Sequence, residues 1–297
     1  MTVTPVTAPP QGLNTSAPAR RRRRGKIGRT IAIAVALFFA LAPLYWMVST
    51  SLKPGIEATR RDPTMLPNDV TAENYQKLFS ENLPFGSFAV NSIVTALAAA
   101  VISVLLSALG GYALSRGTFR LREPISYLVL IAQMLPLVVL LGPLYLLLLN
   151  AELVNTLPGL VVGYISFAVP FGMWLMKGFF DAVPREVEEA ARVDGYPRWQ
   201  ILFRVVLPLT VPGLFTTGTF VFIESWNNLI YPLTLINTID KQTLPAGLIL
   251  SFTGQFKTDW GGMMAASVVT TLPLLVAFFA IQRSMVRGLT AGAVAGE

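Results

Sequence analysis

The strongest indication of the fold is the stretch Phe88–Leu114, which reads FAVNSIVTALAAAVISVLLSALGGYAL. None of its 27 residues is Asp, Glu, Lys or Arg. An α-helix rises about 1.5 Å per residue, so about 20 apolar residues cross the roughly 30 Å hydrocarbon core of a bilayer. The stretch therefore predicts a membrane-spanning α-helix.

Five more apolar runs of this kind flank it: Ile31–Leu52, Ile125–Leu149, Thr156–Met176, Leu209–Leu233 and Met263–Ile281. Of the 297 residues, 53% are hydrophobic and 13% are charged, which is too apolar for an ordinary soluble domain. We therefore expect an all-α integral membrane protein with six transmembrane helices over residues 31–285. A disordered basic tail over residues 1–30 and a cytoplasmic tail over residues 286–297 are expected at the two ends.

Glycine and proline inside these runs predict how the spans pack and bend. Gly110 and Gly111 have no side chains to hold a neighbouring helix away, so we expect a close helix contact there. Four prolines are expected to kink their spans, because each disturbs the helical hydrogen-bond ladder: Pro136, Pro143, Pro170 and Pro273.

The composition excludes most enzyme chemistry. The chain contains no Cys and no His, so thiol nucleophiles, disulfides, thiolate metal sites and imidazole acid–base chemistry are absent. The remaining Ser, Asp and Glu residues show no nucleophile–base arrangement, and we expect no catalytic residue, no metal and no cofactor. There is also no GxxxxGKS/T phosphate loop, which means that ATP would have to be held by another protein.

The basic residues indicate how the chain lies in the membrane. The net charge of +7 comes from Lys and Arg beside apolar runs, where anionic lipid is the expected counter-charge and nucleic acid is not an expected partner. With the N-terminus inside, most of the 23 Lys and Arg fall on the cytoplasmic side. We expect a multi-pass protein of the cell membrane with both termini cytoplasmic. A secretory signal after Arg20–Arg24 is the alternative for the first run, although no clean cleavage box follows it.

Two long connections are expected on the outer side, Lys53–Ser87 and Thr234–Gly262, and neither is apolar enough to span. In the first, Thr71 is a candidate N-cap for a short helix over Ala72–Phe79. Both connections offer surfaces to an external partner.

The most charged part of the chain lies between the fourth and fifth runs, over Gly178–Pro208: GFFDAVPREVEEAARVDGYPRWQILFRVVLP. Pro184 is well placed to begin a helix and Gly195 to end it. Glu188 lies four residues before Arg192, which predicts an ion pair on one helix face. Small residues on the opposite face would let another surface approach closely: Ala190 and Ala191.

A second short helix is expected to begin near Pro197 and to lead back to the membrane. By its amphipathic character alone, the loop could instead rest at the lipid interface. Its full pattern is more specific: Glu189-Ala190-Ala191, two residues, Asp194-Gly195, and twelve residues further on Leu207-Pro208. This pattern closely resembles the EAA loop of ATP-binding-cassette (ABC) importer permeases, whose helix docks into a groove of a cytoplasmic ATPase.

The resemblance covers the chain from about Ile31 to its C-terminus, and its later motifs are similar to those of the carbohydrate-uptake branch: Trp226-Asn227, Pro232-Leu233, Thr243-Leu244-Pro245, Trp260, Met264-Ala265-Ala266 and Gly288-Leu289-Thr290-Ala291-Gly292. The end of the chain is similar to the smaller of the paired maltose-type permeases. Glu224, two residues before Trp226, is a departure that maps to no common family position.

The resemblance implies the type I ABC importer permease fold and uptake of a mono- or oligosaccharide. The implied partners are a second homologous permease, two cytoplasmic ATP-binding subunits and an extracytoplasmic sugar-binding protein. It also implies that Thr290–Glu297 reach the ATPase. An ATPase-coupling role is implied for the loop residues that match the motif: Glu189, Ala190, Ala191, Asp194, Gly195, Leu207 and Pro208.

The solute pathway is marked less clearly. Residues of the fifth span recur at steps of three and four and share one helix face: Phe220, Glu224, Asn227, Asn228 and Tyr231. An ionised residue within a span usually faces a cavity or a partner, so this face is expected to line the route. The alternative is that Glu224 and Asn227 bond to neighbouring helices. Weaker candidates for the route are Asn91, Thr95 and Gln133.

Two other functions stay open at this point. An ion-coupled secondary transporter would use Glu224 as its proton or cation site, although it would have no use for an ATPase-docking loop. The same ATP-driven machinery could also carry a sugar alcohol or a glycerophosphate ester.

Overall fold

The computed structural model describes residues 19–80, 83–254 and 258–294, which form two compact units, Met1–Val48 and Ser49–Glu297. The first unit is the greater part of helix α1 (Ala19–Ser51). The segment Gly28–Ser51 of α1 is long and apolar enough to cross a membrane. Its side chains Phe38 and Phe39 are 70% and 72% exposed. Because α1 begins at Ala19, residues 19–30 of the tail that we expected to be disordered are helical.

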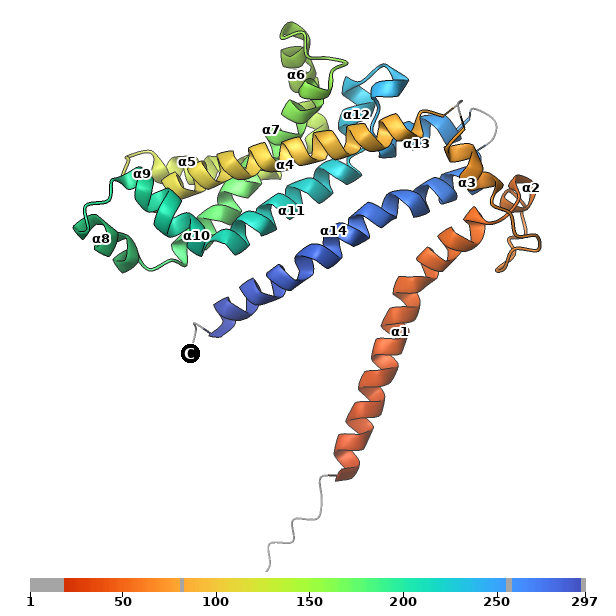
Figure 1. Ribbon diagram of the computed structural model, residues 1–297, viewed down its shortest axis with the longest axis horizontal. Helices are drawn as coiled ribbons and strands as arrows, with labels where there is room; N and C mark the ends of the chain where they lie inside the picture. The colour runs from red at the N-terminus through yellow and green to blue at the C-terminus, as the bar shows by residue number, and fades with distance from the viewer. Residues whose placement is uncertain (1–18, 81–82, 255–257, 295–297) are drawn as a thin grey trace, which may run out of the picture. The chain divides into compact units, whose positions relative to one another are not determined.

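The second unit is built on two long helices, α4 (Phe85–Arg116) and α7 (Leu157–Asp181), with α11 (Val211–Asn227) beside them (Figure 1). The first two run in the same direction, since Ser107 in the middle of α4 donates to the carbonyl of Val169 and the end of α4 reaches that of α7. Their interface is close: a Cβ on Gly111 would lie 2.9 Å from the backbone of Met173 and Lys177. The expected close contact at this glycine is thereby confirmed.

The third expected span is not one helix. It consists of α5 (Arg122–Met134) and α6 (Leu137–Asn150), bent by 104° where Leu135 and Pro136 adopt extended backbone. Proline lacks an N–H donor and disfavours helical geometry in the residue before it, so the ladder ends there. Pro136 thus breaks its span, whereas three other prolines lie inside continuous helices: Pro143 in α6, Pro170 in α7 and Pro273 in α14 (Trp260–Val294).

The fifth expected span is also broken. The helical segment Arg198–Leu209, which ends in the short helix α10 (Leu207–Leu209), meets α11 at a bend of 77°, and α11 ends at Asn227. The chain becomes helical again in α12 (Ile230–Leu235). The span expected over Leu209–Leu233 begins within two residues of the start of α11, but it is not continuous, because the helix is interrupted at Asn228 and Leu229. The residues expected on its single face are divided between α11, this break and α12.

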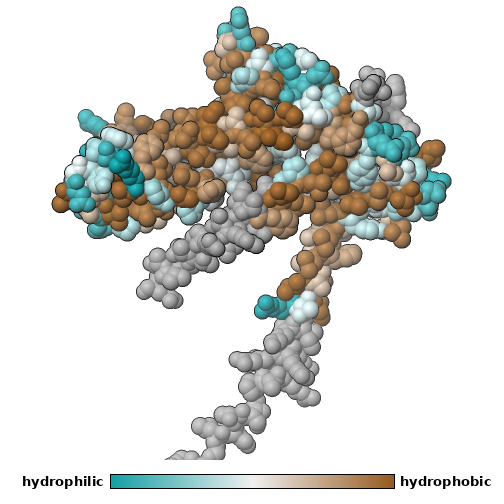
Figure 2. Space-filling view, in the orientation of Figure 1, coloured by the Kyte–Doolittle hydropathy of each residue, from teal (hydrophilic) through white to brown (hydrophobic). Residues whose placement is uncertain are grey.

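By length and composition, three helices of the described residues can cross a membrane, or five if each bent pair is one span. The sixth expected run, Met263–Ile281, lies within α14, whose segment Trp260–Val276 is apolar over its described side chains. That helix continues to Val294, so most of the tail expected over residues 286–297 has helical backbone. The side chains of its last residues lie outside the described part. Figure 2 shows apolar surface along the bundle and hydrophilic surface at its ends.

One end of the second unit holds the two connections expected outside the membrane. It contains α2 (Gly55–Ala58), α3 (Glu73–Leu78), the 3-10 helix η2 (Ile239–Lys241) and α13 (Leu244–Phe252). The N-cap position of α3 is Ala72, which makes no side-chain cap bond, so the expectation that Thr71 is the N-cap is wrong; its hydroxyl accepts from the backbone N–H of Glu73 at 3.2 Å from one position further out. The buried Asn74 amide donates to the carbonyls of Ser51 and Lys53 at 2.9 and 2.8 Å. These bonds give the first connection a defined structure.

Candidate functional site: a loop helix and a central cavity

The loop helix lies where the sequence predicts it. It is α8 (Arg185–Val193), preceded by Pro184 in extended backbone and carrying two acidic residues in its first turn, where they favour the helix dipole. Gly195 follows with φ +83°, a left-handed conformation that glycine adopts at little cost. The N–H of Tyr196 then donates to the carbonyl of Ala191 at 3.0 Å, which closes the helix end.

Helix α8 has an inner and an outer face. On the inner face, Glu188 and Ala191 are buried, and Ala191 packs in a cluster with Met176, Phe180 and Ile201. On the outer face the side chains are exposed: Glu189, Ala190, Arg192 and Val193. Successive residues of a helix are about 100° apart, so the two adjacent alanines cannot share a surface. The expectation that Ala190 and Ala191 together meet a partner is therefore corrected, because Ala191 faces this chain's own core.

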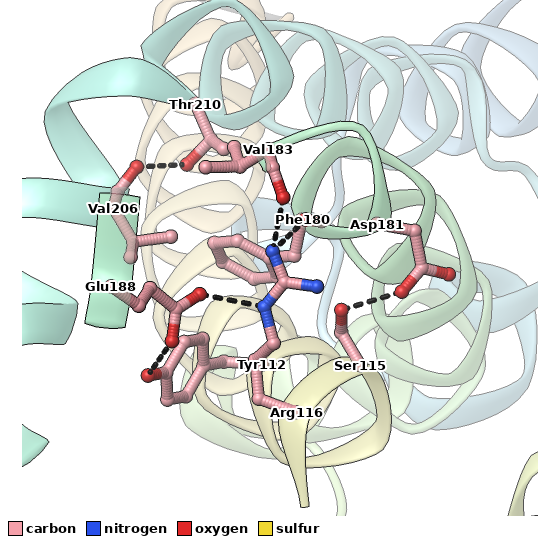
Figure 3. Close-up of polar contacts among 9 residues, drawn as sticks. All are labelled: Tyr112, Ser115, Arg116, Phe180, Asp181, Val183, Glu188, Val206 and Thr210. Carbon is pink, nitrogen blue, oxygen red and sulfur yellow. Dashed lines mark hydrogen bonds and ion pairs between the residues drawn. The ribbon is translucent and has the colours of Figure 1, made fainter. Parts of the chain in front are cut away.

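The buried carboxylate of Glu188 is held by α4 rather than by its own helix (Figure 3). Arg116 Nε lies 2.6 Å from Glu188 Oε1, and the hydroxyl of Tyr112 donates to Glu188 Oε2 at 3.1 Å. Among the described residues three ion pairs form, and Arg192 belongs to none of them. The expected Glu188–Arg192 pair is wrong, since an exposed pair on one helix gains far less than a buried, directed contact.

Sequence reasoning missed Arg116 as a partner of the loop. The only signal available was indirect: a glutamate on the apolar side of an amphipathic helix needs a cation if that side is buried. A neighbouring group ties the same helix ends together, because Asp181 accepts from Ser115 of α4 and from Lys177 at 2.6 Å.

The second loop helix is a composite of α9 (Arg198–Gln200), the π-helix η1 (Ile201–Val206) and α10. The N–H of Leu207 donates to the carbonyl of Leu202, five residues back. Leu202 and Val206 pack in the same cluster as Ala191, whereas Leu207 is half-buried and Pro208 is exposed. The expected return toward the bundle is confirmed, and Pro208 lies just before the 77° bend.

A cavity of about 60 Å³ lies between α5, α7, α11 and α12. Its lining is aromatic and polar: Gln133, Tyr164, Phe167, Ala168, Phe171, Phe220, Glu224, Ser225, Asn228 and Tyr231. The rings of Phe171 and Phe220 lie 4.3 Å apart between centroids. Of the residues expected to line the solute route, the structure brings Glu224, Asn228 and Tyr231 together here, along with Gln133.

The polar groups of this cavity differ in how they are held. Gln133 donates to the carbonyl of Phe167 at 3.2 Å, and the Asn228 side-chain oxygen accepts from the N–H of Tyr231 at 3.0 Å. That second bond gives a partner to a backbone N–H in the first turn of α12, after the break. Glu224 is exposed, and within the described residues it has no hydrogen-bond or ion-pair partner. Its carboxylate is free to meet water, a solute or another subunit.

The other candidates lie elsewhere. Asn227 is exposed and donates to the carbonyl of Ile223 at 3.0 Å, away from the cavity lining. Asn91 is buried and donates to the carbonyls of Asp240 and Gln242 at 2.8 and 3.0 Å, so it holds the η2 turn against α4. Thr95 donates to the carbonyl of Asn91 in its own helix at 2.7 Å. The structure does not bring these three into the cavity.

The described residues contain no group of three or more Asp or Glu that could hold a metal ion. Two candidate functional features have been described: the helix α8, which packs at one end of the bundle, and the cavity between α5, α7, α11 and α12.

Comparison with known proteins agrees with this architecture. Residues 103–291 match the family described as the binding-protein-dependent transport system inner membrane component. The diacetylchitobiose uptake system permease protein DasC of Streptomyces coelicolor is 39% identical over 264 residues, covering 89% of this chain and 95% of that protein. The trehalose transport system permease protein SugB of Mycobacterium tuberculosis is 38% identical over 260 residues, covering 87% and 93%.

A solved structure, that of a bacterial ABC transporter involved in the import of the acidic polysaccharide alginate, matches with a TM-score of 0.76 and 22% identity. It covers 91% of this chain and 99% of the matched chain, so the whole fold is shared. This chain belongs to the family of inner membrane components of binding-protein-dependent transport systems.

Proposed function

We propose that this chain is the permease subunit of an ATP-driven importer that carries a mono- or oligosaccharide. The observation that carries the proposal is α8, a helix fixed to the bundle by its inner face while its outer face stays exposed. Curated relatives named for diacetylchitobiose and trehalose transport support a sugar as the solute. The chain itself performs no catalysis, and ATP is hydrolysed by its partners.

The proposed complex contains this chain, a second homologous permease, two ATP-binding subunits and an extracytoplasmic sugar-binding protein. Both termini and α8 would lie in the cytoplasm, where the basic residues at the α8 end agree with the positive-inside rule. The ATPase would dock on the exposed side of the loop: Glu189, Ala190, Asp194 and Gly195. Leu207 and Pro208 would support it at the bend.

We also place the solute route along the cavity wall formed by Glu224, Asn228 and Tyr231. The cavity within this chain, about 60 Å³, has room for only a few water molecules. A sugar would therefore need a route completed by the second permease. Aromatic rings and an unpaired carboxylate suit a polyhydroxylated solute, because the rings stack on its apolar face and the carboxylate accepts from its hydroxyls.

The test is uptake by the whole complex in proteoliposomes, with radiolabelled di- and oligosaccharides outside and ATP in the compartment that holds the ATPase. We expect uptake only when both ATP and the binding protein are present. Competition by unlabelled sugar alcohols and glycerophosphate esters distinguishes the solute classes. Uptake by this chain alone, driven by an ion gradient and abolished by Glu224→Gln, would instead identify a secondary transporter.

A further inference from the structure

Arg116 is bonded to three segments of the chain at once. It lies in the last turn of α4, and its side chain is 10% exposed. Its Nε lies against the Glu188 carboxylate of α8, whose side chain is 3% exposed. Its Nη2 donates to the carbonyl of Phe180 in α7 at 2.8 Å and to that of Val183 in the α7–α8 connection. Figure 3 shows the guanidinium between these groups.

The chemistry of these contacts gives the joint a defined geometry. The last carbonyls of a helix have no partner within the helix. Phe180 lies in the last turn of α7, and its carbonyl accepts both from Arg116 and from the N–H of Val183 at 3.1 Å. A guanidinium presents several donors in a rigid plane, so one side chain can satisfy carbonyls and a carboxylate together. The Tyr112 hydroxyl, 3.1 Å from the second carboxylate oxygen, fixes the rotation of the carboxylate.

Packing alone would leave this joint less defined. The apolar cluster of Ala191, Phe180 and Ile201 holds α8 against the bundle, but apolar contact is non-directional and tolerates sliding. A buried ion pair is costly unless its geometry is kept, and such pairs are best known for fixing register. The same burial means that a shift of α8 relative to α4 would leave Glu188 without its cation.

We propose that Arg116 is a positioning residue that makes α8, the end of α4 and the end of α7 one rigid body. This inference rests on the proposed function. When a bound ATPase displaces α8, the displacement would pass directly to α7, which carries Tyr164 and Phe171 in the cavity wall. Arg116 would thus link the ATPase surface to the solute route without touching either the ATPase or the solute.

The experiment measures the position of α8 relative to α4 in the whole complex. Because the chain has no Cys, two introduced cysteines are the only sites in it for spin labels, at Leu105 on the exposed side of α4 and at Glu186 on α8. Electron–electron double resonance gives the distance distribution with and without a non-hydrolysable ATP analogue. In the otherwise unmodified chain we expect one narrow distribution that does not change with the analogue.

Two variants then break the joint to different degrees. Glu188→Gln removes the charge that pairs with Arg116, and Arg116→Lys keeps the charge but cannot reach both carbonyls. We expect a distribution that is about twice as broad or more in Glu188→Gln, a smaller broadening in Arg116→Lys, and a shift with the analogue in both. Lys177→Gln is the matched control, because it removes a nearby ion pair that is 27% and 41% exposed and does not involve α8.

Two results would overturn the inference: distributions in both variants as narrow as in the unmodified chain, or an analogue-dependent shift in the unmodified chain. Recovery of each variant with its ATPase by co-purification shows that the protein has folded. If Glu188→Gln does not insert into the membrane, the milder variant Arg116→Lys still tests the inference. Failure of the proposed function would be seen separately, as an unmodified complex that takes up no saccharide with ATP. Even then, the label distances would decide whether Arg116 fixes α8.

Discussion

Two glutamates of this chain have opposite environments. Glu188 is buried at the end of the bundle and is bound by Arg116 and Tyr112, whereas Glu224 is exposed at the cavity and has no partner among the described residues. In sequence both are acidic residues beside apolar ones. A carboxylate that is buried and paired fixes two elements together, and one that lies unpaired at a hollow is available to something outside this chain. We therefore propose that the α8 joint is rigid and that the cavity makes contact with a group outside this chain.

The largest expected effect tests that contrast directly. Glu188→Ala leaves Arg116 buried without its counter-charge, so the free energy of unfolding should fall by about 3–5 kcal/mol. Glu224→Ala removes an exposed group and should change it by no more than about 0.5 kcal/mol. Denaturant titration of the purified chain in mixed micelles measures both. Similar losses in the two variants would remove the distinction between the sites.

The next effect separates the two faces of α8. Ala191→Arg forces a long charged side chain into the cluster around Phe180, so the chain itself should be destabilised, by roughly 1–3 kcal/mol or more. Ala190→Arg lies on the outer face and should leave stability within about 0.5 kcal/mol while reducing recovery of the ATPase. Denaturant titration and co-purification distinguish them. Normal ATPase recovery with Ala190→Arg would show that the docking surface lies elsewhere.

A smaller effect is expected where α4 meets α7. A methyl group at Gly111 would lie 2.9 Å from the α7 backbone, so Gly111→Ala should cost about 1–3 kcal/mol. Gly178 is the matched control in α7, since nothing lies within 4 Å of an added Cβ. There alanine should stabilise the helix by up to about 1 kcal/mol. Opposite signs in the two titrations are the expected result, and equal effects would contradict a close contact at Gly111.

The smallest effect concerns a third acidic residue, at the other end of the second unit. Hydrogen bonds from Thr64 and the N–H of Asn68 to the Glu57 carboxylate lower its pKa below the ordinary value of 4.5. Because the folded pKa is the lower one, this stabilisation is present above pH 4.5 and is lost as the pH falls through the folded pKa. Stability measured from pH 6 to pH 3 should decline less steeply in Glu57→Gln. An unchanged slope would show that Glu57 does not contribute.

Much of the architecture could be predicted from local features of the chain. The apolar runs indicated the spans because a bilayer demands a minimum apolar length, and Pro184 and Gly195 indicated the bounds of α8 because each has a fixed backbone preference. Pro136 marked a disturbance for the same reason. How far the backbone bends there, 104°, depends on what α5 and α6 pack against, and no local rule contains that information.

The candidate site was predicted only in part. Glu224, Asn228 and Tyr231 do line one cavity, but Asn228 reaches it through the break after Asn227 rather than along a continuous helix face. Asn91 looked similar in sequence and instead bonds two carbonyls of a distant turn. A polar residue in an apolar run needs a partner or a cavity, and periodicity cannot say which it will find.

The sequence by itself determined that the chain is helical and membrane-spanning, that it has no cysteine or histidine chemistry, and that a charged loop helix interrupts the spans. These features follow from composition, run length and the backbone preferences of proline and glycine, all of which act within a few residues. Only the tertiary structure decided that Glu188 pairs with Arg116, that Ala191 faces inward and that Glu224 has no partner among the described residues. The first two outcomes depend on contacts between residues up to 76 positions apart, which form only when α4, α7 and α8 pack together.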